Sequence, residues 1–403
     1  MPNLMPKSFF IKTSKKTFFT VGPSQIYPTV PSHIQKTIKT DILSMSHRSQ
    51  EFRDIYRETV DGLKKLLNIP PEYQIVFVSS ALEAMERILQ SMSHNKQSFS
   101  SSNTFHILTG FFGKTWMDIS NDLGKSTDFF QFFDWEKNSY KAIKQLSYKA
   151  PDTFFETEFE NIKIPEKSEL VCITQNDTSV GFSIPMEEIY ALRKKYPNKL
   201  FALDIVSSAP YIDIEYKYLD AVFFSVQKGF GLPAGLCILI LSPKAVKKAQ
   251  KLSSLKGYST GSYHSLVKLV ENSKKFQTVE TPNVLGIYLL GCVVKDFLKI
   301  GIRSLRQRLD RQAQMLYSFF SGSGFASSFI KEERYQSKTT PVFEIAKGSE
   351  GLRKFAAVKG LILGAGYKDF KNKHIRIGNF PALTVKNTKR LLTVLRNFQQ
   401  SAN

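Results

Sequence analysis

The sequence predicts an α/β protein of two domains, the larger built on a mostly parallel β-sheet. Its 403 residues exceed one typical domain and suffice for two lobes around a large buried core. Short apolar runs alternate with amphipathic helical stretches along most of the chain. These runs show little polar alternation, which is typical of strands buried on both faces of a parallel sheet. The pattern therefore predicts a large α/β/α sandwich.

The strands and helices of this sandwich follow in order along the chain. Six apolar runs are predicted strands: 75–79, 105–109, 170–174, 200–204, 221–225 and 236–241. Apolar residues recur every three or four positions in three intervening stretches, which predict helices over 49–67, 81–93 and 186–196. The composition of 94–103 and 257–265 predicts loops.

The pattern changes after residue 283. A long helical stretch over roughly 284–318 leads into a tail in which short strands, at 341–346 and 374–378, alternate with helices. We therefore predict a large domain over 17–290. A smaller α+β domain should comprise 291–403 together with the N-terminal arm 1–16.

Composition excludes several classes of protein. Hydrophobic residues make up 42% and charged residues 23%, as in folded globular proteins rather than disordered ones. No apolar run reaches the roughly 18 residues that span a bilayer. Cys172, Cys237 and Cys292 lie in apolar stretches without a metal-binding or redox spacing, as expected of buried thiols in a reducing compartment. We expect a cytoplasmic protein without a metal site.

The formal charge of +21, from 56 basic and 35 acidic residues, would suit a nucleic-acid-binding protein. The distribution of the basic residues along the sequence does not favour nucleic-acid binding. Basic residues are spread through helical stretches beside acids and form no compact basic–aromatic module. We interpret them as a solvated surface that attracts anionic substrates, and nucleic-acid binding by a catalytically inactive relative stays a distant alternative.

The segment 225–235, SVQKGFGLPAG, is the most informative part of the sequence. Its Lys228 follows a buried strand and precedes three glycines and a proline. This places the lysine at the carboxyl edge of the sheet, where open α/β sheets bind ligands. Desolvation there would lower the pKa of the amine and make it a nucleophile towards an aldehyde. A surface lysine in a glycine turn is the alternative.

Asp204 favours the first interpretation. It ends the strand 200–204 and lies 24 positions before Lys228, so two sheet-edge groups of opposite charge can face one site. In pyridoxal chemistry, an aspartate beside the pyridine nitrogen keeps that nitrogen protonated. The alternative is that Asp204 only caps the end of its strand.

Several separated motifs, in the right order, resemble the class V, fold-type I aminotransferases, and most closely the phosphoserine aminotransferases. They run from Val21-Gly22-Pro23 through 46–52 (SHRSQEF) to Ile375-Arg376-Ile377. The resemblance implies pyridoxal 5'-phosphate as the cofactor. It also implies that Lys228 is the Schiff-base lysine and moves a proton between the substrate α-carbon and the cofactor, with Asp204 as the partner of the pyridine nitrogen.

Further cofactor contacts follow from the same resemblance. Gln227 matches a residue that helps hold the phosphate, and Thr178, in NDTSVG at 176–181, matches one near the cofactor's phenolic oxygen. Phe112 matches the aromatic residue that stacks on the ring.

Ser80 and Ala81 open a helix whose free amides and positive dipole end can receive the phosphate. The family usually has threonine or arginine where Leu82 stands, so this chain lacks one side-chain contact to the phosphate.

Thr281 matches a threonine that reaches the phosphate from a neighbouring subunit, which implies a homodimer with shared active sites. Glu280 replaces the usual asparagine beside it, and we expect its carboxylate to turn away from the phosphate. Arg376 matches the arginine that binds the α-carboxylate. His47 and Arg48 match the pair that receives the substrate's phosphate or side-chain carboxylate.

The resemblance implies transamination between an amino acid and a 2-oxo acid. Glutamate would donate its amino group, and 3-phosphohydroxypyruvate would accept it in serine biosynthesis. An alanine–glyoxylate or serine–glyoxylate (or pyruvate) aminotransferase is the alternative, because those enzymes have similar His-Arg segments. A cysteine desulfurase of the same fold type is a third possibility, and it needs an exposed, reactive cysteine.

Overall fold

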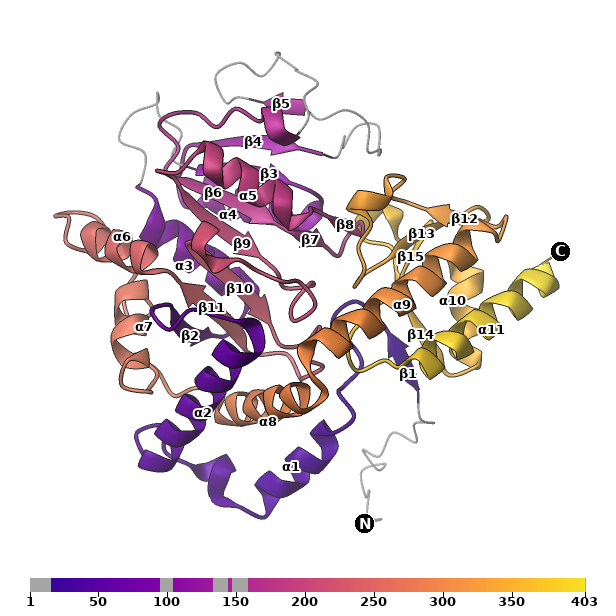
Figure 1. Ribbon diagram of the computed structural model, residues 1–403, viewed down its shortest axis with the longest axis horizontal. Helices are drawn as coiled ribbons and strands as arrows, with labels where there is room; N and C mark the ends of the chain where they lie inside the picture. Colours follow the sequence, from indigo (N-terminus) through magenta and orange to yellow (C-terminus); the bar gives the residue numbers. More distant parts are fainter. Residues whose placement is uncertain (1–15, 95–103, 133–143, 147–158, 403) are drawn as a thin grey trace, which may run out of the picture.

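Two β-sheets organise the chain in the computed structural model, which describes residues 16–94, 104–132, 144–146 and 159–402 (Figure 1). The larger sheet has the strand order β2-β11-β10-β9-β6-β3-β4-β5. Its strands are β2 (Gln74–Val78), β3 (Thr104–Leu108), β4 (Thr127–Gln131), β5 (Lys144–Leu146), β6 (Leu170–Thr174), β9 (Leu200–Asp204), β10 (Ala221–Ser225) and β11 (Cys237–Leu241). All six predicted strands are present, with ends that differ by at most one residue from the prediction.

The larger sheet is mostly parallel, as the sequence predicted. Strands β10, β9, β6, β3 and β4 pair in parallel, whereas β11 runs antiparallel to β10 and β2, and β5 runs antiparallel to β4. Every residue of β6, β9, β10 and β11 is buried. This burial explains the continuous apolar runs in the sequence.

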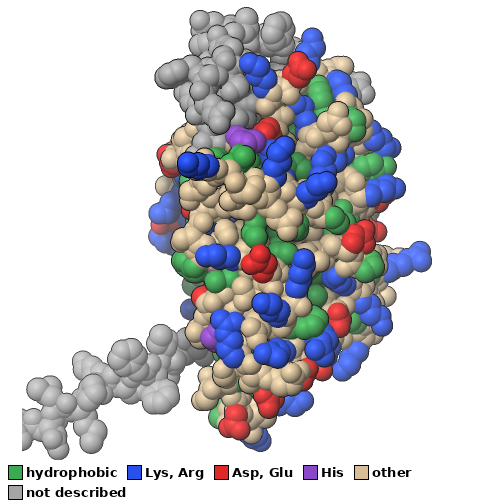
Figure 2. Space-filling model, turned by 90° about the vertical axis from the view of Figure 1, so that its left-hand side faces the viewer, with side chains coloured by type: hydrophobic (Ala, Val, Ile, Leu, Met, Phe, Trp, Pro, Cys, Tyr) green, Lys and Arg blue, Asp and Glu red, His purple; other side chains and the backbone are tan. Residues whose placement is uncertain are grey.

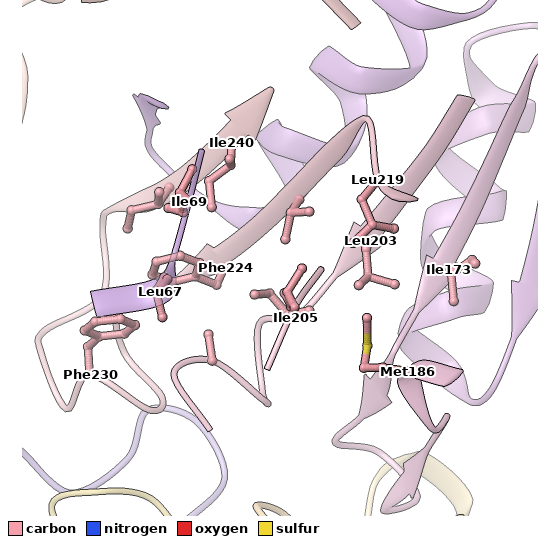
Figure 3. Close-up of a cluster of buried hydrophobic side chains, with 14 of the residues drawn as sticks. Leu67, Ile69, Ile173, Met186, Leu203, Ile205, Leu219, Phe224, Phe230 and Ile240 are labelled. Atoms are coloured by element: carbon pink, nitrogen blue, oxygen red, sulfur yellow. The ribbon is translucent and has the colours of Figure 1, made fainter. Parts of the chain in front are cut away.

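Helices cover both faces of this sheet (Figure 1). One face packs against α3 (Ala81–Met92), α4 (Phe111–Asp122), α6 (Pro243–Ser253) and α7 (Leu266–Ser273). The other packs against α2 (Gln50–Leu67), α5 (Met186–Lys195) and α8 (Val284–Ile300). On this second face, Leu203, Phe224 and Ile240 from neighbouring strands join one apolar cluster with Leu67 and Met186 (Figure 3).

Shorter elements complete the larger unit. Helix α1 (Val30–Ile38) and the 3-10 turn η1 (Asp41–Ser44) pack on α8. The turns η2 (Phe159–Asn161) and η3 (Tyr216–Tyr218) lie beside α5. Strands β7 (Asn176–Asp177) and β8 (Phe182–Ser183) form a separate two-stranded hairpin. The predicted loop 257–265 contains neither helix nor strand, and of the predicted loop 94–103 only His94 lies within the described residues.

The smaller sheet has the order β1-β14-β15-β13-β12 and its own apolar core. Its strands are β1 (Thr17–Phe19), β12 (Ala326–Ser328), β13 (Val342–Ile345), β14 (Leu361–Ala365) and β15 (His374–Arg376). Helices α9 (Ile302–Ser321), α10 (Glu350–Val358) and α11 (Val385–Ala402) contribute to that core, and the turns η4 (Glu333–Tyr335) and η5 (Lys368–Phe370) connect its strands.

The structure adds two details to the predicted organisation. Residue 17 was assigned to the larger domain, whereas β1 pairs in parallel with β14 in the smaller sheet. The predicted helical stretch over roughly 284–318 is present as two helices, α8 and α9, which meet at Gly301. Gly301 has φ +85°, which interrupts a helix and which residues with a side chain rarely adopt. The boundary at 290/291 stays a prediction, and the arm 1–16 lies outside the described residues except for Lys16.

Two surface properties bear on function. On the face shown in Figure 2, Lys and Arg side chains are spread over the whole surface, with acidic side chains among them. Within the described residues, no helix is both long and apolar enough to cross a membrane.

Candidate functional site

A cavity of about 430 Å³ lies where the carboxyl ends of the parallel strands meet the smaller sheet. Its volume is typical of a pocket for a small organic ligand. Eight of the residues singled out in the sequence line it: Ser80, Ala81, Phe112, Thr178, Asp204, Gln227, Lys228 and Arg376. They follow β2, β3, β6, β9 and β10 and include the last residue of β15. The structure therefore brings residues from the whole length of the chain to one sheet edge.

Lys228 carries the amine of this cavity. Its side chain is 9% exposed, and its Nζ donates a hydrogen bond to Thr178 Oγ1 at 3.2 Å. The same Nζ lies 5.2 Å from the centre of the Phe112 ring. Burial lowers the pKa of Lys228, although the carboxylates of Asp204 and Asp177 oppose that shift. The amine therefore deprotonates more easily than a free lysine, as a nucleophile requires.

The N-terminal segment holds the lysine loop in place. Ser24 donates from its backbone N to Gln227 O at 3.0 Å and from its Oγ to Lys228 O at 2.8 Å. Gly22 lies against the lysine side chain, because a Cβ at Gly22 would be 3.0 Å from Lys228 Cε. Gly229 must also lack a side chain, since a Cβ there would lie 1.9 Å from Ala209 O. Close packing therefore explains two of the glycines around the lysine.

Asp204 faces the same cavity from the end of β9. It is 4% exposed, and its Oδ1 accepts a hydrogen bond from the backbone N of Val206 at 2.8 Å. Burial raises the pKa of Asp204, while that hydrogen bond and the charge of Lys228 act in the opposite direction. A buried carboxylate of this kind is stabilised by a cation placed next to it.

The N-terminus of α3 supplies hydrogen-bond donors. Ser80 caps the helix, because its Oγ accepts from the backbone N of Glu83 at 3.2 Å. Among the described residues, none accepts a hydrogen bond from the amides of Ala81 and Leu82. These two amides and the positive end of the helix dipole are suited to bind an anionic group. The Leu82 side chain at this end is 52% exposed.

Two aromatic rings lie side by side in the cavity. The rings of Phe112 and Tyr367 have their centres 5.4 Å apart, and Tyr367 also contacts the guanidinium of Arg376 at 5.4 Å. Phe112 is fixed by its backbone N, which donates to Asp177 Oδ2 at 2.9 Å. The Phe112 ring is therefore held beside the Lys228 amine.

Arg376 closes the cavity from the smaller sheet. Its Nε donates to Ala365 O at 2.6 Å, and its Nη1 donates to Thr178 O at 3.2 Å. Within the described part of the chain, no residue accepts from its Nη2. Burial lowers the pKa of Arg376, but a guanidinium stays charged at any working pH. The side chain is thus an oriented cation in the cavity.

Three predicted residues lie apart from this cavity. Arg48 donates from Nη1 to Gln277 Oε1 at 2.9 Å and to Thr278 O at 3.1 Å, which brings it next to the segment that contains Thr281. Burial and the neighbouring Arg48 lower the pKa of His47. Within one chain, His47, Arg48 and Thr281 are not among the residues that line the cavity.

The sequence indicated no role for several residues at the site, among them Tyr367, which lines the cavity, and Asp177, which holds Phe112 in place. Asp177 is fully buried and accepts hydrogen bonds from the backbone N of Phe112 and Gly113, which lie in the first turn of α4. It therefore caps a helix from a different strand, and no local pattern signals that. Gly110 leaves room for it, because a Cβ there would lie 2.6 Å from Asp177 Cγ. For Tyr367, the only signal was the glycine-rich sequence GAGY at 364–367, which includes the last two residues of β14.

The cysteines were expected to be buried, and this was wrong for one of them. Cys172 and Cys237 are buried, and burial raises the pKa of each thiol. Cys292 lies on α8 and is only half-buried, and its pKa is also raised by burial. None of the three lines the cavity, so the arrangement does not favour a desulfurase.

Comparison with known proteins identifies the family. The model of the family "Aminotransferase class-V" matches residues 17–107 and 139–367. The chain is similar to the phosphoserine aminotransferases of Rhodococcus opacus (strain B4), at 23% identity over 380 residues, and of Lactococcus lactis subsp. lactis (strain IL1403), at 25% over 335. These matches cover 93% and 81% of this chain and 92% and 82% of the relatives.

Solved structures agree with the sequence matches. A phosphoserine aminotransferase from Cytophaga hutchinsonii is 32% identical with a TM-score of 0.85, and the match covers 96% of this chain and 99% of that one. An alanine–glyoxylate aminotransferase from Nostoc sp. has the same fold at 17% identity, with a TM-score of 0.75 over 98% of this chain and 97% of that one. The fold is therefore that of the fold-type I aminotransferases, and the chain is an aminotransferase that belongs to the class-V family.

Proposed function

We propose that this protein is a phosphoserine aminotransferase that carries pyridoxal 5'-phosphate on Lys228 and works as a homodimer in the cytoplasm. One observation carries the choice of substrate: the chain is 32% identical, over nearly its whole length, to a structure described as a phosphoserine aminotransferase. The lining of the cavity supports the choice of cofactor. In the proposed reaction, glutamate donates its amino group and 3-phosphohydroxypyruvate accepts it.

The residues of the cavity fit pyridoxal phosphate. A buried amine and a buried carboxylate, Lys228 and Asp204, line one cavity of about 430 Å³. The amides of Ala81 and Leu82 offer donors for the phosphate, and the Phe112 ring offers a flat apolar surface for the cofactor ring. When bound, the cofactor supplies an aldehyde that reacts with amines and a ring that withdraws electrons from the substrate α-carbon.

Each residue of the chain then has a distinct task. The lowered pKa of Lys228 makes its neutral amine easier to form than that of a free lysine. That amine would hold the cofactor and, once the amino group of the substrate has displaced it, would accept the proton of the substrate α-carbon. The Asp204 carboxylate would stabilise the protonated pyridine nitrogen of a bound cofactor, and that cation would offset the cost of burying the carboxylate. The hydroxyl of Thr178 receives a hydrogen bond from Lys228 Nζ and so orients the amine.

Arg376 is the proposed clamp for the α-carboxylate of the amino acid. A guanidinium presents a planar fork that matches a carboxylate. Two of its donors are fixed by the carbonyls of Ala365 and Thr178, which orients the remaining Nη2 in the cavity.

The residues that lie outside the cavity support the proposed dimer. Arg48 contacts the segment of Thr281 within one chain. The resemblance assigns Arg48 to the substrate's phosphate or side-chain carboxylate and Thr281 to the cofactor phosphate of a neighbouring subunit. A second copy that presents this surface to the cavity would supply His47, Arg48 and Thr281 to the site. The free surface of Leu82 at that end would then be covered by the partner.

An acceptor assay tests the proposal. Purified protein loaded with pyridoxal phosphate is given glutamate together with either 3-phosphohydroxypyruvate or glyoxylate, and formation of 2-oxoglutarate is followed with a coupling enzyme. We expect turnover with 3-phosphohydroxypyruvate to exceed turnover with glyoxylate. Absence of turnover with 3-phosphohydroxypyruvate would reject the proposal.

A glyoxylate or pyruvate aminotransferase is the second candidate. The His47-Arg48 pair is compatible with it, because glyoxylate aminotransferases of the same class have similar His-Arg segments. A second assay, with alanine or serine as the amino donor and glyoxylate as the acceptor, follows the pyruvate or hydroxypyruvate formed and decides between the two. Preferential transfer from alanine or serine to glyoxylate would establish the second candidate.

A further inference from the structure

Behind the N-terminus of α3, one histidine lies between two carboxylates. His264 Nδ1 pairs with Glu83 Oε1, and His264 Nε2 pairs with Glu280 Oε2 at 2.6 Å. Glu83 belongs to the first turn of α3, whereas Glu280 directly precedes Thr281. The side chains of His264 and Glu83 are 10% and 18% exposed, so their contact is largely shielded from water, whereas the Glu280 side chain is 32% exposed. His264 therefore links the first turn of α3, at this subunit's own cavity, to the segment whose Thr281 the proposed function assigns to the site of the partner subunit.

Each ring nitrogen of His264 faces a carboxylate oxygen, and donating to two ionised carboxylates takes hydrogen on both nitrogens. A neutral imidazole has one N–H donor, so its other nitrogen would face a carboxylate oxygen with a lone pair. An imidazolium donates to both carboxylates and adds a positive charge between them. The geometry thus suits an imidazolium between two carboxylates at the start of α3.

A positive charge on His264 matters because Glu83 is itself a charged neighbour of the cavity. Its Oε2 accepts hydrogen bonds from the backbone N of Ser79 at 2.8 Å and from Ser79 Oγ at 2.5 Å, next to the cavity-lining Ser80. Burial alone would raise the pKa of Glu83, but the hydrogen bonds from Ser79 and His264 outweigh it and lower the pKa. A charged carboxylate therefore lies beside the place where a phosphate would bind, and it would repel that phosphate.

The loop that carries His264 is fastened along the length of α3. Tyr258 OH donates to Gln90 O at 3.1 Å and to Ser93 O at 2.7 Å, near the end of the helix. Gly261 passes close to Arg87, since a Cβ there would be 2.6 Å from Arg87 Nη1. His264 then reaches the first turn. The position of the imidazole is thus set by contacts at three levels of the helix.

We propose that His264 is a positioning residue for the phosphate end of the cofactor. It holds the Glu83 carboxylate against Ser79 and offsets its negative charge, so that the amides at the start of α3 can bind a phosphate. This inference rests on the proposed function, because it needs a phosphorylated cofactor in the cavity.

Cofactor titration tests this role. Cofactor-free protein is titrated with pyridoxal 5'-phosphate and, separately, with pyridoxal, which lacks the phosphate, and the absorbance change gives the dissociation constant. We expect His264→Ala to weaken binding of the phosphorylated form about tenfold or more, the scale of losing one charged hydrogen bond, and to change binding of pyridoxal less than about twofold. His264→Gln keeps a single donor and should give a smaller loss, so it replaces the alanine variant if that variant does not fold.

Rescue separates charge compensation from simple packing. Glu83→Gln removes the negative charge and keeps an acceptor for Ser79. In the double variant with His264→Ala, it should restore affinity for pyridoxal 5'-phosphate to within about twofold of Glu83→Gln alone. The control is His33→Ala, which breaks another histidine–carboxylate pair, His33 Nε2 with Asp296 Oδ2 at 2.9 Å, away from the cavity.

The outcomes are distinct. Wild-type affinity in His264→Ala, equal losses for both ligands, or no rescue by Glu83→Gln would overturn the role of His264 while leaving the proposed function intact. Failure of the wild-type protein to bind pyridoxal 5'-phosphate would overturn both.

Discussion

Single side chains carry the chemistry of this protein, and burial gives them their properties. Lys228 and Asp204 are both nearly inaccessible to water, and each has its pKa shifted towards the neutral form. An exposed lysine and aspartate would remain fully charged at neutral pH. Burial therefore converts two ordinary residues into a nucleophile and a partner for a cation.

Lys228→Ala should abolish transamination, with a loss of about 100-fold to 10,000-fold or more, because the variant lacks the amine that accepts the α-carbon proton. The fold should persist, since a desolvated amine contributes little to stability. Borohydride treatment followed by peptide mass analysis should fix the cofactor on Lys228 of the wild-type protein. Lys125, a second buried lysine that donates to Ser93 O at 2.6 Å outside the cavity, is the control and should stay unlabelled. Activity in Lys228→Ala would contradict the assignment.

Asp204→Asn should cost activity and change how the stability of the cofactor-free protein depends on pH. The pKa of Asp204 is raised above 3.8 in the folded protein, so above that pH the folded state holds a proton that the unfolded chain has lost. The free energy of unfolding of the wild type therefore falls as pH rises from 3.8 towards the raised value, and the variant lacks this decrease. The melting temperature of Asp204→Asn minus that of the wild type should therefore be larger at pH 7 than at pH 4. Asp310→Asn, on α9, is the control, and a difference that is the same at both pH values would reject the argument.

Arg376→Ala should raise the KM for glutamate by about 10-fold to 150-fold, which corresponds to the loss of about 1.5–3 kcal/mol from a charged hydrogen-bonded pair. Arg376→Lys keeps the charge but not the planar fork, so it should recover only part of the affinity. Steady-state kinetics with varied glutamate give the comparison. Arg390→Ala removes an arginine that donates to Lys359 O on the surface and should leave the KM unchanged. An unchanged KM in Arg376→Ala would reject the clamp.

The residues of the cavity were predictable where a strand end and a recognisable motif coincide. Lys228, Asp204 and Thr178 each follow or end a buried strand within a distinctive segment, and the structure brings them together. Asp177 and Tyr367 were not predicted, because both act on Phe112, which is far away in the sequence. Asp177 accepts a hydrogen bond from the backbone N of Phe112, about 65 positions away, and Tyr367 contacts the Phe112 ring from about 255 positions away. Sequence neighbours carry no information about such contacts.

Among the secondary-structure elements, the central strands were predicted best. Their apolar runs are short, continuous and bounded by polar residues, so their ends could be read within one residue. The predicted helical stretch did not specify the junction between α8 and α9, because the apolar periodicity continues across Gly301. A single glycine in a helical pattern is often tolerated, and only its φ of +85° shows that the helix ends there.

Gly301→Ala should destabilise the protein by about 1–2 kcal/mol, because alanine at positive φ is strained. Thermal unfolding should show a lower melting temperature with little change in the cofactor spectrum. The matched control is Gly322→Ala, at the end of α9, where φ is −95° and the nearest atom to an added Cβ is 3.8 Å away. That variant should unfold at the wild-type temperature or slightly above it. Equal stability of the two variants would show that the junction tolerates a regular helix.

If the two subunits of the proposed dimer share residues at each active site, a dimer of two different inactive variants should regain activity. Lys228→Ala and Arg48→Ala should each be inactive or strongly impaired alone. In a hybrid dimer, one site would combine the intact Lys228 of one subunit with the intact Arg48 of the other. Co-expression with two affinity tags should therefore yield hybrids with up to about half of wild-type activity. Hybrids as inactive as the parents would show that Arg48 does not act across the interface.

The stretch 17–24 has a mechanical consequence for the two sheets. It begins as a strand of the smaller sheet, passes over the lysine side chain at Gly22, and ends with Ser24 hydrogen-bonded to the lysine loop. Any rotation of the smaller sheet against the larger one would therefore pull this stretch along the amine. Movement of the smaller sheet towards the larger one is therefore coupled to the position of Lys228 Nζ. A ligand that brings the two sheets together would also restrict the movement of the nitrogen that reacts with it.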